Sequence, residues 1–597
     1  MYIAVSLFNQ HFAFAFNPFK NVILKKQTSL VIKFPLFAAL LLSALPVKAQ
    51  VDAGALQRNY QRQLTEPNSQ LPKVSVPDAK PSETIKDKGP RFTVRQFILE
   101  GVKAIPEEKV QEVLKPWLDQ SVDFDELQNA CDAIMELYRK NGLNAQALLP
   151  PQKISQGQVR ILITEAKLGS VIINQPEGPT RFSPEEAKKY ITHNNPIGEL
   201  LNNDKLQNAL ILLKETPGLI VRSSLEPGDN DGEVSVKMDL SDDRLATERL
   251  EINNYGSRLT GANQAVAGLQ LSDPLGIGDQ AGVSVISSVG SQFGQVTYLA
   301  PIGYDGFKAG VNATYLNYTN VSNYKYPNGG YGNAWTASPN VTYPLMRSEQ
   351  TNVSVNAGYF LSYYTNYNIV GNTVSSAYNT NSATFGLSAN HADSFAGGGS
   401  SSAYLIVESG NVAISPTSPS NYGVYIPHNY NKLNFTLSRS QQLTEDGLNA
   451  ATLVVNGQFA SANLVSSELF YLGGPQAIRA YPIAQSGGAQ GGVASLDINH
   501  KLWDNYTISA FYDYGLVQQY RTNAAYTALK GLTNANNTYS LSGTGLSLKW
   551  NSGGWALLGM VAWAIGKNPL YNSSGQAVNV DSTTTKPLGW FSAAYNF

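Results

Sequence analysis

From about residue 245 to the C-terminus, apolar and polar side chains alternate one by one, in stretches such as 307–315, 352–363 and 432–438. A period of two predicts β-strands that separate two unlike environments. The polar positions are mostly Ser, Thr, Asn and Gly, and the apolar positions are rich in tyrosine. Nothing in this region reaches the run of about 20 apolar residues that a spanning helix requires. A bundle of membrane helices is therefore excluded, whereas a barrel is not.

The distribution of charge separates the same region from the rest of the chain. Of 43 basic and 44 acidic residues, only 27 lie after residue 250, whereas 28 of the 32 tyrosines do. The charged share is about 8%, against about 25% in ordinary soluble domains. These features favour a transmembrane barrel with an apolar, aromatic outer face and a hydrated interior. A secreted β-sandwich is the alternative, but its water-facing side would normally carry Lys and Glu.

Strand length sets the expected size of this barrel. Strands of about 9–11 residues with their turns fit between about 14 and 18 times into residues 243–597. We expect an all-β transmembrane barrel of about 16 antiparallel strands, closed because lipid cannot satisfy an unpaired edge. The last stretch, 591–597, alternates up to the terminal Phe597.

The N-terminal region has the parts of a secretory signal. Lysines at 25, 26 and 33 precede an apolar stretch at 34–45 and small residues at Val47 and Ala49. We predict that residues 1–49 are a cleavable signal peptide, with a short membrane anchor as the alternative. The one cysteine, Cys131, excludes an intramolecular disulfide and falls in a predicted helix, where core packing is its expected role.

Residues 50–65 are predicted to contain a helix. The stretch 52–64 lacks proline, Asp52 can cap it, and Leu56, Tyr60 and Leu64 lie four apart on one face. A lone helix of this length is marginal in water, so it must dock, and a disordered terminus is the alternative. The prolines spread through residues 66–90 indicate an extended linker.

Residues 91–166 and 167–242 carry two copies of one β-α-α-β-β pattern. The sequence Leu-Gln-Asn-Ala at 127–130 recurs at 206–209, and Gly157-Gln-Val recurs as Gly232-Glu-Val. The recurrence predicts two small α+β domains. Their predicted elements are 92–99, 106–118, 124–141, 145–149 and 158–164 in the first copy, and 170–174, 183–192, 204–215, 220–225 and 233–240 in the second.

The order of signal, helix, proline-rich linker, two repeats and barrel resembles the two-partner secretion transporters of Gram-negative bacteria, the hemolysin activator/secretion type in the POTRA-barrel superfamily. The resemblance implies that the repeats are POTRA domains in the periplasm and that the barrel lies in the cell outer membrane. It also implies that the helix at 50–65 plugs the barrel and that the partner is a large secreted exoprotein. Outer-membrane lipid and the barrel-assembly machinery, with Phe597 as C-terminal signal, are further implied partners.

The most specific local match is the stretch 473–482, which reads GGPQAIRAYP. The family carries a lumen loop that reads Val-Arg-Gly-Tyr/Phe. Ile478, Arg479, Ala480 and Tyr481 stand in its place, shortly after Gly473 and Gly474. Ala480 departs from the family glycine. Alanine resists the positive φ or close backbone approach that glycine permits, so the tightness of the loop tip is in question.

The second match is the stretch Phe511-Tyr-Asp513-Tyr-Gly515. Alternation places Phe511 and Asp513 on the lumen side of a strand, so Asp513 is free to meet Arg479, as the family aspartate does. A guanidinium can hold a carboxylate through two parallel hydrogen bonds. In a hydrated lumen such a pair contributes about 1 kcal/mol, so its main effect would be to fix one loop conformation. Alternatively, Arg479 is one of several lumen charges, or a solvated loop residue.

Other function classes find little support. A net charge of −1 gives no case for nucleic acid. No Gly-x-Ser-x-Gly elbow or Walker loop occurs, so we expect no catalytic residue and no cofactor, and a client that folds outside the cell would drive transport without ATP. A barrel-assembly factor and a plain diffusion channel with the repeats as spacers are the alternatives. No metal is expected either, because the five histidines are scattered: His11, His193, His391, His428 and His500.

Overall fold

The computed structural model describes residues 51–64, 91–154, 156–321, 329–348, 350–529, 536–571, 576–581, 583–584 and 586–597. The predicted signal peptide (1–49) and linker (66–90) lie outside these residues.

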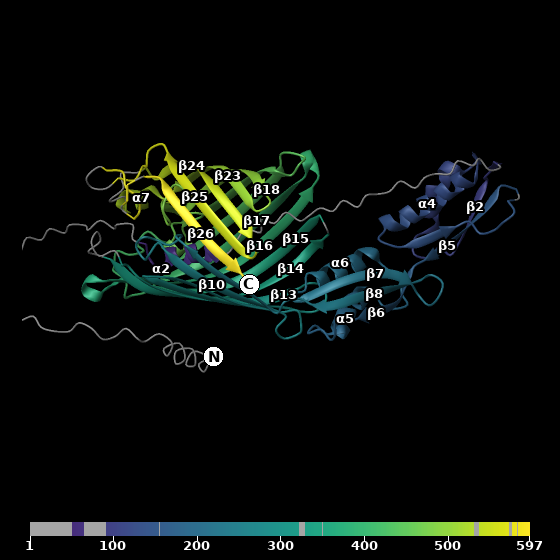
Figure 1. Cartoon of the computed structure of the whole chain (residues 1–597), viewed down its shortest axis with the longest axis horizontal. Helices are drawn as coiled ribbons and strands as arrows, with labels where there is room; N and C mark the ends of the chain where they lie inside the picture. Colours follow the sequence, from purple (N-terminus) through teal and green to yellow (C-terminus); the bar gives the residue numbers. More distant parts are fainter. Residues whose placement is uncertain are drawn as a thin grey trace, which may run out of the picture. The chain divides into compact units, whose positions relative to one another are not determined.

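In the described part of the chain, 16 antiparallel strands form a closed barrel (Figure 1). The predicted fold class and strand number are confirmed. The strands, in their order around the barrel, are β9 (Ala246–Asn253), β10 (Gln264–Ser272), β11 (Gln280–Ser288), β12 (Ser291–Pro301), β13 (Lys308–Thr319), β14 (Gly330–Arg347), β15 (Thr351–Asn368), β16 (Val374–Asp393), β17 (Gly399–Ile414), β18 (Asn429–Gln442), β19 (Asn449–Ala460), β22 (Gln490–Trp503), β23 (Tyr506–Gln518), β24 (Thr538–Ser552), β25 (Trp555–Ile565) and β26 (Leu588–Asn596).

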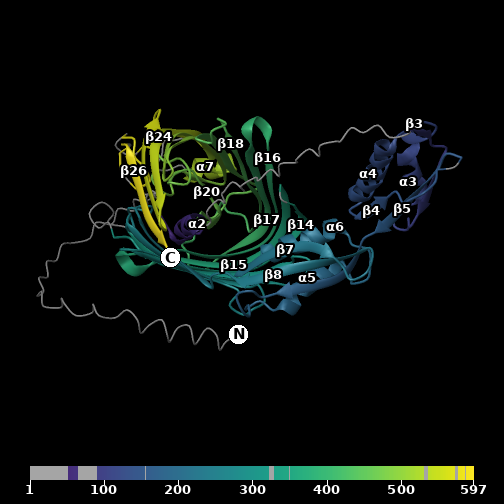
Figure 2. The same ribbon diagram turned by 45° about the vertical axis from the view of Figure 1, so that its right-hand side comes forward.

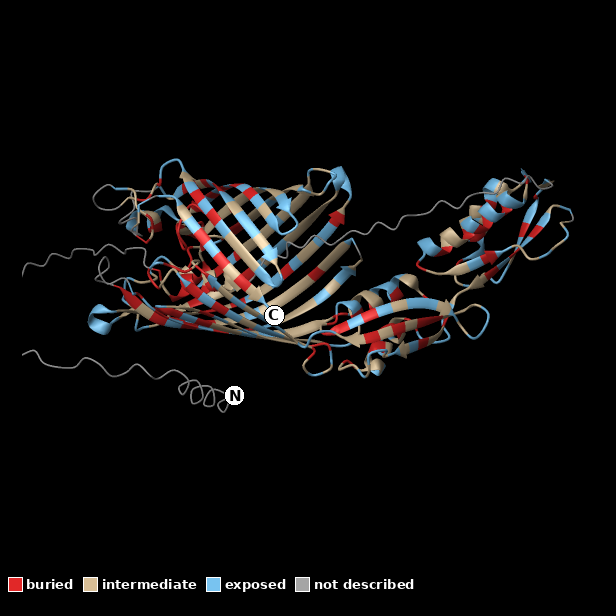
Figure 3. Cartoon of the chain, in the orientation of Figure 1, coloured by how far each residue is buried: buried red, intermediate tan, exposed pale blue. Residues whose placement is uncertain are grey.

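The two faces of the barrel wall follow the alternation in the sequence (Figure 3). On β23, Ile508, Tyr512 and Leu516 are exposed on the outside, whereas Ser509 and Asp513 are buried inside.

The expected strand length was wrong for β14, β15 and β16, which have 18, 18 and 20 residues. A strand needs only about 9–11 residues to cross the hydrocarbon layer, so these hairpins continue beyond it.

The seam between the first and last barrel strands is short. β26 pairs with β9 through five residue pairs, from Ser592 with Asn253 to Asn596 with Arg249. The side chain of Asn254 extends the seam, because its Nδ2 donates to Gly589 O at 2.8 Å and its Oδ1 accepts from Phe591 N at 2.7 Å. The backbone N–H of Asn254 also donates to Phe591 O at 3.1 Å, so the backbone and the side chain of Asn254 together continue the seam.

Two α+β domains precede the barrel in the sequence. Each has a three-stranded sheet with a parallel and an antiparallel pair, in the orders β2-β5-β4 and β6-β8-β7. The elements of the first domain are β1 (Phe92–Thr93), β2 (Gln96–Glu100), α3 (Glu107–Leu114), η2 (Lys115–Trp117), β3 (Ser121–Val122), α4 (Phe124–Lys140), β4 (Ala145–Leu148) and β5 (Gln158–Glu165). Those of the second are β6 (Lys167–Asn174), α5 (Pro184–Asn194), α6 (Asn203–Lys214), β7 (Leu219–Pro227) and β8 (Glu233–Asp242).

Two element predictions for the first domain need correction. The predicted strand 92–99 is divided at Val94, whose N–H donates to Gln120 O while the N–H groups of Arg95 and Gln96 turn to Gly157 O. The chain therefore changes partners there, from β3 to β5. The predicted helix 106–118 changes at Lys115 into the 3-10 turn η2, where a proline follows. Lys115 keeps the α conformation, with φ −49° and ψ −38°, but Pro116 has no N–H to continue the α-helical hydrogen-bond pattern.

Cys131 lies in the core of the first domain, where it is fully buried on α4. This helix has a capping box, because Asp123 Oδ1 accepts from Glu126 N at 2.9 Å and Glu126 Oε2 accepts from Asp123 N at 2.9 Å. Burial, with a smaller contribution from the charge of Asp132, raises the pKa of the Cys131 thiol to about 11. The thiol is therefore a packing group with little thiolate character at neutral pH.

The second domain contacts the turns at one end of the barrel. Tyr304, between β12 and β13, packs edge-on against Tyr190 of α5 and donates its hydroxyl to Glu186 Oε2 at 2.9 Å. Arg347 at the end of β14 lies 3.4 Å from Glu215 after α6. These contacts bring the second domain against the same end of the barrel at which β9 begins.

Candidate functional site: the barrel lumen

A long connection between β19 and β22 folds back into the barrel. We call residues 461–489 the lumen segment. It contains the 3-10 turn η5 (Ser466–Glu468) and the short strands β20 (Phe470–Tyr471) and β21 (Gly487–Gly488), which pair with each other. Gly487 and Gly488 stand opposite Tyr471 and Phe470. Their pairing with β20 gives the lumen segment a hairpin of its own.

The tip of the lumen segment is a tight loop. Gly474 has φ +120°, and its N–H donates to Tyr481 O at 3.0 Å. A Cβ on Gly473 would lie 2.1 Å from Pro482 O, so only glycine fits there. Ile478 and Tyr481 are fully buried and pack with Phe511 of the wall. The predicted motif residues thus form one packed loop inside the barrel.

Arg479 at this tip is held by two carboxylates on adjacent wall strands. Its Nε and Nη2 donate to Asp513 Oδ2 and Oδ1 on β23 at 3.0 and 2.7 Å. Its Nη1 and Nη2 donate to Asp497 Oδ1 and Oδ2 on β22 at 2.7 and 3.1 Å. The backbone N–H of Arg479 adds a further bond to Asp513 Oδ2 at 2.9 Å. The structure therefore places the guanidinium in two bidentate pairs, which fix its plane as well as its position.

Two aromatic residues complete the surroundings of Arg479. The guanidinium carbon lies 3.5 Å from the centroid of the Phe511 ring, which is a close cation–π contact. Trp590 on β26 donates its indole Nε1 to Arg479 O at 2.7 Å. We call Arg479, Asp497, Asp513, Phe511 and Trp590 the arginine anchor.

Asp497 was not among the residues singled out from the sequence. A signal for it exists, because Leu496 and Ile498 beside it are exposed on the outside, and alternation then turns Asp497 toward the lumen. A carboxylate at an inward position of a charge-poor barrel is a candidate partner for a lumen cation. Asp497 stands directly opposite Phe511 in the pairing of β22 with β23.

Ala480, which departs from the family glycine, fits into a space on the barrel wall. Ala480 is buried, and its Cβ points at Gly543 on β24. A Cβ on Gly543 would lie 2.5 Å from the Ala480 Cβ, closer than two carbon atoms can approach. The missing side chain of Gly543 therefore makes the room that the Ala480 methyl fills. Gly515 on β23 similarly leaves space for Ile478 Cδ1, which would lie 2.7 Å from an added Cβ.

The N-terminal helix α2 (Ala53–Leu64) lies inside the barrel (Figure 2). Asp52 caps it as predicted, since its Oδ1 accepts from Ala55 N at 3.0 Å. Leu56 and Tyr60 are fully buried, and Leu64 packs against the same cluster. Gln57 Nε2 donates to Thr314 Oγ1 on β13 at 2.9 Å and to Thr336 Oγ1 on β14 at 2.6 Å. The helix is thus seated on side chains of the wall.

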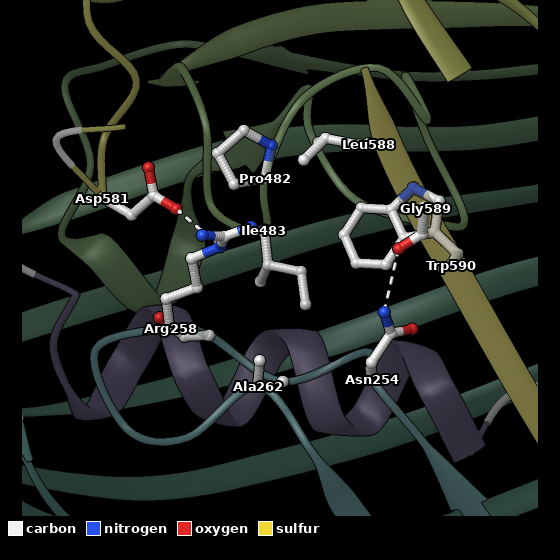
Figure 4. Close-up of a pocket in the computed structure, with 11 residues that line it drawn as sticks. Asn254, Arg258, Ala262, Pro482, Ile483, Asp581, Leu588, Gly589 and Trp590 are labelled. Carbon is white, nitrogen blue, oxygen red and sulfur yellow. Dashed lines mark hydrogen bonds and ion pairs between the residues drawn. The ribbon is translucent and has the colours of Figure 1, made fainter. Parts of the chain in front are cut away.

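A small cavity of about 50 Å³ lies beside the connection between β9 and β10 (Figure 4). Pro482 and Ile483 of the lumen segment line it together with Asn254 and Trp590. Arg258, from the connection between β9 and β10, lies 3.6 Å from Asp581 Oδ2 and is otherwise largely exposed. The lumen segment therefore also meets the connections at the seam.

The C-terminal Phe597 follows β26. Its N–H donates to Glu248 O on β9 at 3.0 Å, and its ring packs edge-on against Tyr595 at 4.7 Å between centroids. The ring is about half exposed on the barrel surface.

Within the described ranges, no helix is long and apolar enough to cross a membrane. Among those same residues, no group of three or more His, Cys, Asp or Glu side chains is arranged to hold a metal ion.

A closed barrel behind two α+β domains, with a helix and a loop in its lumen, is the architecture of a POTRA-barrel transporter. The model of the haemolysin secretion/activation proteins ShlB/FhaC/HecB matches residues 232–538, and that of the ShlB-type POTRA domain matches residues 92–166. Because the first match spans more than half of the chain, the protein belongs to the ShlB/FhaC/HecB family. It is a two-partner secretion transporter, which translocates an exported partner protein.

Curated relatives and solved structures agree with this assignment. The chain is 25% identical over 546 residues to the heme/hemopexin transporter protein HuxB of Haemophilus influenzae, covering 87% of this chain and 92% of the relative. It resembles the structure of CdiB from Escherichia coli with a TM-score of 0.72 and 18% identity, over 92% of this chain and 99% of that one. BamA from Haemophilus ducreyi, lacking POTRA domains 1–3, gives a TM-score of 0.50 at 14% identity, over 85% and 100%. The barrel-assembly fold is the weaker match.

Proposed function

We propose that the protein is a passive outer-membrane pore, without catalytic chemistry of its own, that passes one unfolded exoprotein to the cell surface. The observation that carries this proposal is that two pieces, α2 and the lumen segment, fill the lumen without being strands of the barrel wall. Both combine buried apolar side chains, such as Leu56 and Ile478, with hydrogen bonds to polar side chains of the wall. Because the closed wall does not need either piece for its strand pairing, both can leave the lumen without opening the barrel.

The proposed orientation places both α+β domains in the periplasm and the apolar outer face of the barrel in outer-membrane lipid. The exposed side chains of Tyr315, Tyr359 and Tyr512 suit that lipid contact. Phe597, with its exposed ring at the end of the last strand, is the proposed signal to the barrel-assembly machinery during biogenesis.

The client is proposed to bind first at a sheet edge of the second domain. β7 is an edge strand, paired only with β8, and its Ile220 and Leu225 are 42% and 50% exposed. An extended client can add to such an edge through backbone hydrogen bonds, while alternate side chains fill apolar positions. A large adhesin- or hemolysin-type exoprotein is the proposed client.

The decisive test has two parts. The genes beside that of the transporter are searched for one that encodes a large exported protein. This candidate client is co-expressed with the transporter and measured at the cell surface and in the medium. Purified protein with and without residues 51–64 is then placed in planar bilayers in KCl. We expect the client to remain in the periplasm without the transporter, and removal of the helix to raise the open fraction of the pore. Normal client export without the transporter, or unchanged conductance without the helix, would contradict the proposal.

A barrel-assembly role is the alternative that the BamA fold suggests. Depletion of the protein would then lower many outer-membrane barrels together, whereas a dedicated exporter leaves their levels unchanged. Quantifying outer-membrane porins after depletion distinguishes the two roles.

A further inference from the structure

A second group of buried charges lies on β17 and β18, and β18 is two strands away from β22 of the arginine anchor around the barrel wall. Lys432 on β18 stands directly opposite Glu408 on β17, and its Nζ lies 3.1 Å from Glu408 Oε2. The same ammonium group pairs with Glu468 Oε2 of η5. Lys432, Glu408 and Glu468 are only 4%, 9% and 8% exposed. We call these three residues the lysine cluster.

Each charged group of the lysine cluster has a hydrogen-bond or ion-pair partner. Glu408 has both oxygens occupied, because Oε1 accepts the hydroxyl of Tyr430 at 2.9 Å. Charged groups so far from water are costly unless each has a partner, so the pairs depend on one another. Glu468 is the one member from the lumen segment, and its pairing ties η5 to the wall.

The turn that the lysine cluster holds is also the turn on which α2 rests. Ser466 Oγ donates to Asp52 Oδ2 at 2.6 Å, and Arg58 Nη1 donates to Ser467 O at 3.2 Å. Gln458 on β19 joins both sides, because its Oε1 accepts from Arg58 Nη2 at 2.9 Å and its Nε2 donates to Glu468 O at 2.8 Å. The helix and the wall therefore hold the same three-residue turn.

The net charge of the lysine cluster also links it to α2. Two carboxylates and one ammonium leave the lysine cluster with one uncompensated negative charge. Arg58 of α2 supplies a positive charge that acts on Glu468 through space. When the helix leaves the lumen, this compensation leaves with it, and a buried excess charge is unfavourable.

We propose that Lys432 and Glu468 are positioning residues that couple the residence of α2 in the lumen to the attachment of η5 to the wall. Release of the helix loosens η5, and detachment of η5 from Lys432 loosens the helix, because a coupling free energy acts equally in both directions. The inference rests on the proposed function in one respect, namely that α2 leaves the lumen during transport.

The experiment measures the open fraction of the purified full-length pore in planar bilayers in KCl. In Glu468→Gln, Lys432 and Glu408 still balance each other but the attraction to η5 is lost. We expect the open fraction to rise about tenfold, since a hydrogen bond to a charged group is worth about one factor of ten or more. In Glu408→Gln the Lys432–Glu468 pair remains, so we expect less than about a twofold change by the same reasoning.

The matched control lies on the same strand. Arg439 of β18 pairs with Asp393, with Nη2 3.0 Å from Oδ1, and neither residue contacts the lumen segment in the described interactions. Asp393→Asn should leave the open fraction at the parent value. Equal gating in Glu468→Gln and Asp393→Asn would overturn the proposal.

A double-mutant cycle tests the coupling itself. Arg58→Met lies on the helix and changes no wall residue, so barrel folding is unaffected. Together with Glu468→Gln it should raise the open fraction by clearly less than the product of the two single effects, because both act on one turn. Multiplicative effects would overturn the coupling. If the chain without residues 51–64 conducts like the parent, the proposed function fails; if it conducts more but Glu468→Gln does not, only this inference fails.

Discussion

The lumen segment meets the barrel wall at two ion clusters of opposite construction. In the arginine anchor the cation belongs to the segment and both carboxylates belong to the wall. In the lysine cluster the cation belongs to the wall and one carboxylate belongs to the segment. An arginine fork fixes orientation, whereas a lysine ammonium is a point charge that accepts several geometries.

The two clusters also differ in what else they touch. The arginine anchor packs on Phe511 and Trp590 of the wall, and no described hydrogen bond joins it to α2. The lysine cluster reaches α2 through Gln458 and η5. The comparison suggests a division between a rigid attachment and one that senses the helix. Variants of the arginine anchor should show whether that division holds.

The largest effect is expected from Arg479→Ala. The change leaves the fully buried Asp513 and the partly buried Asp497 without their cation, at a cost of about 3–5 kcal/mol. The barrel should still insert, because its outer face is unchanged, but export of the partner should fall about tenfold or more. Client in the medium and heat-modifiable migration of the barrel are the two measurements.

Arg258→Ala is the matched control for Arg479→Ala, because Arg258 is 59% exposed at its side chain and its ion pair lies at the connection between β9 and β10. Its export level should equal that of the parent. Parent-level export by Arg479→Ala would remove the arginine anchor from the mechanism.

The two carboxylates of the arginine anchor should be unequal. Asp513 is fully buried and accepts three of the bonds from Arg479, including the backbone N–H, whereas the Asp497 side chain is 22% exposed. We expect Asp513→Ala to reduce export in part as Arg479→Ala does. Asp497→Ala should lower export less, because it removes only about 1 kcal/mol of the free energy that attaches the loop to the wall. If Asp497→Ala lowered export as much as Asp513→Ala or more, solvent exposure would not determine how much each carboxylate contributes.

A glycine on the wall should matter as much as the loop residue that it faces. Gly543→Ala would bring two methyl carbons to 2.5 Å and displace the loop tip, so export should fall severalfold. Ala480→Gly loses one buried methyl, worth about 1 kcal/mol. The double variant moves the methyl from loop to wall and should recover most of the export. Additive losses in the double variant would contradict direct contact as the cause.

The smallest effect is expected for maleimide labelling of Cys131 in the folded protein. With its pKa raised to about 11 by burial, the thiol stays protonated below that pH and should resist maleimide at pH 7 in the folded protein. Labelling should begin only as pH approaches that value or when the first domain unfolds. Mass spectrometry after labelling in native buffer and in denaturant makes the measurement. A silent native thiol allows single-cysteine probes to compare the two ion clusters directly.

The local patterns of the sequence predicted more of the wall than of the lumen. Alternation was enough to put Asp513 inside and Tyr512 outside, because a period of two is a property of neighbouring residues. For the lysine cluster, alternation over 432–438 places Lys432 on the polar face but does not identify its partners. Glu408, Lys432 and Glu468 meet only through strand register and the path of the lumen segment, and neither is encoded within a few positions.

The packing around Ala480 also could not be predicted from local sequence patterns. The departure from glycine was visible in the sequence, but the compensating Gly543 lies 63 positions later on β24. Only the closed barrel brings the two residues together. Likewise the seat of α2 is assembled from strands far apart in the chain, so the sequence predicted a docked helix without its neighbours.

That seat also imposes an order on assembly. The helix precedes in the chain every strand that it touches, from β13 and β14 to β19. Its binding surface does not exist until those strands have paired. In a newly inserted molecule we therefore expect the helix to close the pore only after it has docked on strands that are synthesised hundreds of residues later.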